Sequence, residues 1–167
     1  MELYLLRHGI AVEPGTAGFD NDGDRPLTSK GRRQLRKIAG NLKELDCDFD
    51  LILSSPLLRA RQTAEIVADK LKLKKKLRIC EALAPGGAAR LWMRQLEREK
   101  PTPKRVLLVG HEPDLSSLVS LLLAGKTGLE VEFKKAGLCK LEADKLRAGK
   151  CAKLAWLLTP KQLKMIG

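Results

Sequence analysis

The sequence is poor in aromatic residues and in long apolar runs, and each shortage excludes a class of protein. Tyrosine, tryptophan and phenylalanine make up 4% of the 167 residues, so stacking platforms for single-stranded nucleic acid are mostly absent. The longest apolar stretch, residues 118–124, contains Ser120 and is too short to span a bilayer. The chain opens on a strand-like pattern without a basic, cleavable apolar leader, which predicts a cytoplasmic protein.

Metal ligands are also scarce. The chain has two histidines, and its four cysteines show no CxxC spacing, which predicts free thiols at Cys47, Cys80, Cys139 and Cys151. The aspartate series 20–24 lacks the glycine and glutamate of a calcium loop. Gly125-Lys126-Thr127 lacks the first glycine of a P-loop. We therefore expect neither a catalytic metal nor a cofactor.

Positive charge, in contrast, is abundant. Hydrophobic residues are 44% and charged residues 31% of the chain, which predicts one globular domain over residues 1–167. The net charge of +12 favours an anionic partner, and basic residues concentrate at 72–78 and 134–153. A solvated surface also accounts for either cluster. No helix-turn-helix, RNA-recognition or zinc-finger signature is present, which disfavours nucleic acid as the partner.

Strand and helix patterns alternate through most of the chain. Short apolar runs predict strands at 3–6, 49–53, 77–80 and 105–109, and helical spacing predicts helices at 28–42, 57–71, 88–99 and 113–122. After Gly128 three further strands are expected at 129–133, 137–142 and 152–158, followed by a short helix after Thr159-Pro160. The pattern indicates an α/β fold, with a mostly parallel sheet covered on both faces and an antiparallel C-terminal segment.

Unusual residues stand where three of these strands end. They are Arg7-His8-Gly9, Ser54-Ser55-Pro56 and Gly110-His111-Glu112, which include both histidines of the chain. Arg59 follows in the first turn of the next helix, and Thr63 lies one turn later on the same face. Because parallel sheets bind ligands at the carboxyl ends of their strands, these side chains are expected to meet. A histidine held beside arginines is suited to attack on phosphorus.

Four segments together resemble the histidine phosphatase superfamily, the phosphoglycerate-mutase-like phosphatases. They are LLRHG at 5–9, LTSKG at 27–31, SSPLLRARQTA at 54–64 and VGHEP at 109–113, and they cover the first two thirds of the chain. The small size, the run Arg25–Thr28 and the form Gly-His-Glu-Pro-Asp look most like the SixA group of short phosphohistidine phosphatases. The resemblance implies a three-layer α/β/α sandwich.

The resemblance also implies roles for individual residues. His8 would be the nucleophile and form a phosphohistidine intermediate that water hydrolyses, while Arg7, Arg59 and His111 would bind the phosphoryl oxygens. Nearby arginines disfavour the cationic imidazole, so we expect a lowered pKa for His8. Ser55 either adds a contact to the phosphoryl group or serves only as a turn residue before proline.

The general acid is left open between two sets of carboxylates. Glu81, after the third strand, holds the position of the acid in larger family members, and the loop aspartates Asp20, Asp22 and Asp24 are alternatives. A phosphohistidine substrate relaxes the need for an acid, because an imidazole leaving group can carry its own proton near its pKa of about 6.5.

Three functions fit these residues. The first is a metal-independent phosphatase acting on phosphohistidine in a protein, and the second applies the same chemistry to a small phosphorylated compound. Short inserts around the expected site predict an open pocket, which favours a protein-borne substrate. The third is an inactive basic module that uses the pocket to bind anions. The sequence does not define the oligomeric state.

Overall fold

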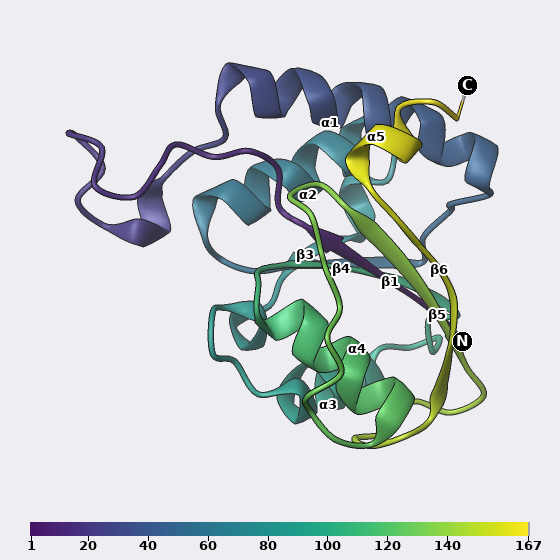
Figure 1. Cartoon of the computed structure of the whole chain (residues 1–167). Coiled ribbons are helices and arrows are strands. Elements are labelled where there is room, and N and C mark those ends of the chain that lie inside the picture. Colours follow the sequence, from purple (N-terminus) through teal and green to yellow (C-terminus); the bar gives the residue numbers. More distant parts are fainter. Residues whose placement is uncertain (167) are drawn as a thin grey trace.

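The protein is built on a twisted sheet of six strands, as the computed structural model, which describes residues 1–166, shows (Figure 1). The strand order across the sheet is β3-β2-β4-β1-β5-β6. Strands β1 to β4 run parallel to one another, β5 runs antiparallel to β1, and β6 runs antiparallel to β5. The bounds are β1 Glu2–Arg7, β2 Leu51–Ser54, β3 Leu77–Ile79, β4 Arg105–Gly110, β5 Leu138–Ala143 and β6 Ala152–Leu158. The mostly parallel sheet and the antiparallel C-terminal segment are thereby confirmed.

Helices cover both faces of the sheet and complete three layers (Figure 1). One face carries α1 (Ser29–Asn41), α2 (Leu58–Lys70) and α5 (Pro160–Leu163), and the other carries α3 (Ala89–Arg98) and α4 (Asp114–Ala124). Strand side chains alternate between the two cores: Tyr4 and Leu6 pack under α1 and α2, while Leu3 and Leu5 pack against the α3 and α4 side. The α/β/α sandwich predicted from the sequence is therefore present.

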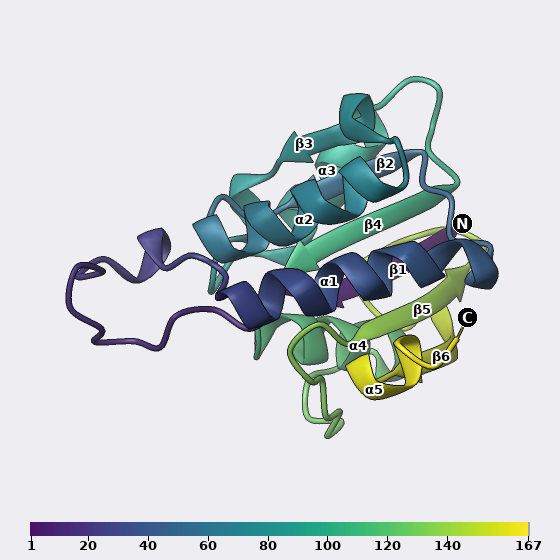
Figure 2. The ribbon, with the colours of Figure 1, turned by 90° about the horizontal axis from the view of Figure 1, so that it is seen from above.

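The register of the sheet brings the distinctive strand ends together. Arg7 of β1 pairs with Gly110 of β4, and Ser54 of β2 pairs with Val109 of the same strand. The carboxyl ends of the three strands therefore lie at one edge. Beyond this edge the chain from β1 to α1 extends outward as a long loop (Figure 2), and it includes a short 3-10 turn, η1 (Asp22–Asp24).

Helix α1 is fixed closely to the loop that follows β1. Its N-cap residue Thr28 accepts a hydrogen bond from the Gly31 amide, and its buried side begins at Gly31 and continues through Leu35, Ile38 and Ala39. A Cβ placed on Gly31 would lie 3.0 Å from the Ile10 carbonyl carbon and closer still to its oxygen. Only glycine permits this approach of helix and loop.

The strand predicted at 129–133 is wrong. The segment forms no strand pairing, although Phe133 is buried in the core. Its backbone groups have other partners, because the Leu129 amide donates to Ser120 Oγ and the Phe133 carbonyl accepts from Arg7. Alternation of apolar residues indicated a strand, but here it reflects a loop with one buried anchor.

The four cysteines carry free thiols, as predicted, and three of them are buried. No helix among residues 1–166 is long and apolar enough to cross a membrane.

Candidate active site

His8 lies directly after β1 and is held by hydrogen bonds at its backbone amide and at one ring nitrogen. Its backbone amide donates to the Gly110 carbonyl at 3.1 Å, which ties it to the end of β4. Its Nδ1 lies 2.8 Å from the Gly9 carbonyl oxygen. A carbonyl can only accept, so in the neutral ring Nδ1 carries the hydrogen and Nε2 carries the lone pair. The second nitrogen is therefore the one available as a nucleophile.

The surroundings of His8 keep the ring uncharged. Burial lowers its pKa to about 4, and the positive charges of Arg59 and Arg7 add to that effect against the opposing hydrogen bond to Gly9. The side chain is 7% exposed. The lowered pKa expected from the sequence is present, although desolvation contributes more than the arginines do.

His111, at the end of β4, faces His8. The centroids of the two rings lie 5.1 Å apart, with an angle of 51° between the ring planes. Burial, together with the neighbouring His8 and Arg59, lowers the pKa of His111 to about 3. Its Nε2 lies 2.8 Å from Ser55 Oγ, while its buried Nδ1 has no hydrogen-bond partner among the described residues. The Ser55 hydroxyl thus contacts His111, and its contact with a phosphoryl group stays a prediction.

Arg59 lies in the first turn of α2, with its side chain 6% exposed. The helix is connected to the His8 loop through Thr63, whose Oγ1 donates to the Arg59 carbonyl at 2.7 Å and accepts from the Gly9 amide at 3.1 Å. The sequence placed Thr63 on the same face as Arg59 but gave it no role. Its hydroxyl fixes the distance between the helix and the loop.

Asp22 bonds to Arg59, and the sequence defined its role least among the residues near His8. Its carboxylate pairs with Arg59 at 2.9 Å and with Arg25 at 2.6 Å, and its backbone carbonyl accepts a further bond from Arg59 at 2.7 Å. The bonds from Arg25 and Arg59 hold the pKa of Asp22 below its ordinary value. Asp22 is therefore ionised and poorly suited to donate a proton. The spacing of Asp22 and Arg25 in one polar loop was the only sequence signal for this cluster.

Arg7 is fixed by the chain that precedes β5. Its guanidinium donates to the Phe133 carbonyl at 2.6 Å, and the Ala136 amide lies within hydrogen-bond distance of both the Arg7 and His8 carbonyls. The Nε atoms of Arg7 and Arg59 are buried and have no hydrogen-bond partner among the described residues. Buried donors without a partner are rare in folded proteins, and two on arginines beside two neutral histidines favour the binding of an anion.

Of the carboxylates considered as general acids, Asp22 alone is bonded to a residue of this cluster within the described chain. Glu81 begins a short 3-10 turn, η4 (Glu81–Leu83), at the end of β3, and its side chain is exposed. No hydrogen bond or ion pair joins it to Arg7, His8, Arg59 or His111 within the described chain. Asp20 and Asp24 are exposed, and Asp24 accepts a hydrogen bond from Asn21. The role of Glu81 therefore stays a prediction.

Residues 1–166 contain no group of three or more histidine, cysteine, aspartate or glutamate side chains arranged to hold a metal ion.

Comparisons with known proteins show which family this chain is similar to. Residues 3–84 match the model of the histidine phosphatase superfamily (branch 1). The phosphohistidine phosphatase SixA of Escherichia coli strain K12 is 30% identical over 168 residues, which cover 99% of this chain and 98% of that protein. An uncharacterised protein of Picosynechococcus is 42% identical over 166 residues, which cover 98% of this chain and 99% of that protein.

A solved structure shows the same architecture. The protein histidine phosphatase SixA in complex with tungstate superimposes with a TM-score of 0.82 and 29% identity, covering 98% of this chain and 99% of that one.

Proposed function

Because the chain belongs to the histidine phosphatase superfamily and is of the SixA type, we propose that this phosphatase removes phosphate from phosphohistidine in proteins. We further propose that residues 1–167 form a single catalytic domain that works without a metal ion. The observation that carries the proposal is the meeting, at one edge of the sheet, of two neutral histidines and two arginines with unpartnered buried donors.

In the first step Nε2 of His8 attacks the phosphorus atom. A bond forms between that nitrogen and phosphorus while the bond from phosphorus to the leaving nitrogen of the substrate breaks in line with it. Arg7 and Arg59 bind the equatorial oxygens, and His111 donates a further hydrogen bond to the same group. The geometry supports these roles, because Ser55 and the Phe133 carbonyl already orient His111 and Arg7.

In the second step a water molecule attacks the phosphorylated His8. The bond from phosphorus to Nε2 breaks, the water oxygen bonds to phosphorus, and inorganic phosphate leaves with His8 neutral again. The substrate imidazole can leave already protonated, so the first step needs no acid from the protein. Glu81 is retained as a candidate for proton transfer to poorer leaving groups, in line with its place after β3.

Replacement of His8 tests the proposal. His8→Ala is expected to abolish both phosphate release and covalent trapping of labelled phosphate, whereas the surface variant Lys161→Ala retains both. Rates are measured on a phosphohistidine protein and on a panel of small phosphate esters. Release of phosphate by His8→Ala at the wild-type rate would end the proposal. A wild-type preference for the small esters would favour a metabolite phosphatase instead.

A further inference from the structure

Helix α1 carries an unusual set of charges on its solvent side. It contains five basic residues and no acidic one: Lys30, Arg32, Arg33, Arg36 and Lys37. Arg32 is half-buried and the other four are exposed. In the described part of the chain none of the five forms an ion pair. We call this set the α1 basic face.

This arrangement is unfavourable for the folded protein alone. The N-terminal end of a helix has a partial positive charge, yet the first turns of α1 hold Lys30, Arg32 and Arg33 without a carboxylate. The spacing also places Arg32 beside Arg36, and Arg33 beside Lys37, one turn apart, where like charges repel. The charges of α1 thus break two rules of helix stability without any gain in packing. Such a violation points to a binding function.

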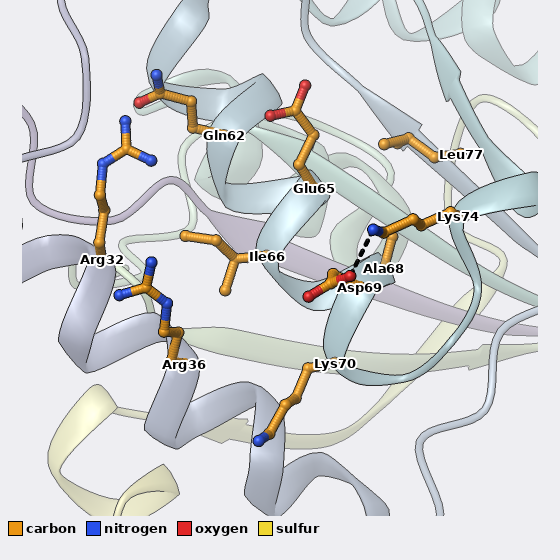
Figure 3. A pocket seen from close by; sticks show the side chains of 10 residues that line it. All are labelled: Arg32, Arg36, Gln62, Glu65, Ile66, Ala68, Asp69, Lys70, Lys74 and Leu77. Carbon is orange, nitrogen blue, oxygen red and sulfur yellow. Dashed lines mark ion pairs between the residues drawn. The ribbon is translucent and has the colours of Figure 1, made fainter.

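A groove between α1 and α2 adjoins this face (Figure 3). It has a volume of about 620 Å³. Figure 3 shows Arg32 and Arg36 extending from α1 toward α2, with Ile66 between the two helices. The opposite side holds Glu65, together with Asp69, which is neutralised by Lys74 at 2.6 Å. The groove thus combines an apolar floor with two arginines on one wall, which suits an extended acidic segment.

The groove begins next to the catalytic edge. The Thr28 amide donates to the Ile10 carbonyl at 2.9 Å, so the start of α1 lies against the loop that leaves His8. At the α2 side, Gln62 lines the groove and its Oε1 accepts from the Leu27 amide at 2.8 Å. A polypeptide whose phosphorylated side chain lies in the active site can therefore continue along α1.

We propose that the α1 basic face and its groove bind an acidic segment of the phosphorylated protein substrate. The proposal rests on the phosphatase function above. A protein fits better than a nucleic acid, because none of the six aromatic side chains is exposed and available to stack on bases.

The experiment compares two phosphohistidine peptides of identical length, one flanked by glutamates and the other by glutamines. The variants are Arg32→Glu/Arg36→Glu, the milder Arg32→Gln/Arg36→Gln, and the control Lys104→Glu/Lys145→Glu, which changes the net charge as much as the first. Lys104 and Lys145 are exposed, do not line the groove, and lie before β4 and after β5, at the opposite edge of the sheet. The readouts are kcat/KM on each peptide and on free phosphohistidine, with melting temperatures to confirm folding.

We expect the wild type to prefer the acidic peptide by about tenfold at low salt, and high salt to remove the preference. The glutamate variant should lose the preference, the glutamine variant should lose most of it, and the control should keep it. Rates on free phosphohistidine should stay the same throughout. No wild-type preference, or an equal loss in the control, would overturn the proposal.

Binding of the unphosphorylated acidic peptide, measured by fluorescence anisotropy, separates this inference from the phosphatase function. Peptide binding that depends on Arg32 and Arg36 supports the docking surface even if no phosphate is released, and then the catalytic proposal alone fails. Absence of such binding together with normal turnover would overturn the docking proposal and leave the phosphatase proposal standing. Tighter binding of duplex DNA than of the peptide through the same arginines would make nucleic acid the occupant and would also overturn the proposal.

Discussion

Replacement of Gly31 by alanine changes the free energy of unfolding through two opposing effects, a gain in helix propensity and a steric clash. Alanine in place of a helical glycine stabilises a protein by about 0.5–1 kcal/mol through the unfolded chain and helix propensity. The added Cβ would press on the Ile10 carbonyl, which is backbone and cannot rotate away. Overpacking costs about 1–3 kcal/mol, and a backbone contact belongs at the upper end of that range. We expect Gly31→Ala to be destabilised by about 2 kcal/mol.

The same helix supplies the control. A Cβ on Gly40 would have as its nearest neighbour the flexible Lys70 side chain, at 3.5 Å. Gly40→Ala should therefore be stabilised by about 0.5–1 kcal/mol. Thermal unfolding measures both, because about 2–4 °C corresponds to 1 kcal/mol in a protein of this size. Gly31→Ala should also turn over substrate more slowly, since Ile10 lies two residues after His8. A Gly31→Ala protein as stable as the wild type would refute the reasoning.

Three further predictions concern the site. His8 and His111 have pKa values of about 4 and about 3 in the folded protein, below the value of 6.5 expected when unfolded, so the unfolded chain binds more protons as pH falls. The free energy of unfolding should therefore decrease between pH 7 and pH 5, by roughly 3–4 kcal/mol for the pair, as urea denaturation would detect; equal stability at both values contradicts this. Ser55→Ala removes the partner of His111 Nε2 and should lower kcat about tenfold in steady-state assays, with KM little changed; unaltered kcat would leave Ser55 without a positioning role. Thr63→Val leaves the Gly9 amide without its acceptor and should destabilise the protein by about 1–3 kcal/mol in urea, whereas an unchanged midpoint would show that the bond is dispensable.

The sequence predicted which side chains lie near one another where sheet register alone decides their position. His8, Ser55 and His111 follow strands whose carboxyl ends must share one edge, so their proximity needed only the parallel pattern. Predicting the place of Arg59 also required knowing which way the helix after β2 turns its side chains. Its position in the first turn of that helix supplied this information.

The rest depended on long-range contacts that periodicity does not encode. The pairing of Asp22 with Arg25 and Arg59 joins a loop to a helix across 37 residues. The segment 129–133 carries a strand-like alternation, yet its groups bond to a serine hydroxyl and an arginine side chain. Neither partner is visible from local spacing. The expected contribution of Glu81 likewise depends on where a bound substrate would lie.

The position of β1 between a parallel and an antiparallel neighbour has a consequence for how the enzyme can vary. Both backbone edges of the strand are occupied, so a shift of one residue would disrupt two ladders and invert every side chain along it. The position of His8, directly after this strand, is thus protected from gradual displacement. The loops around it can change in length or sequence without shifting the strand that carries it.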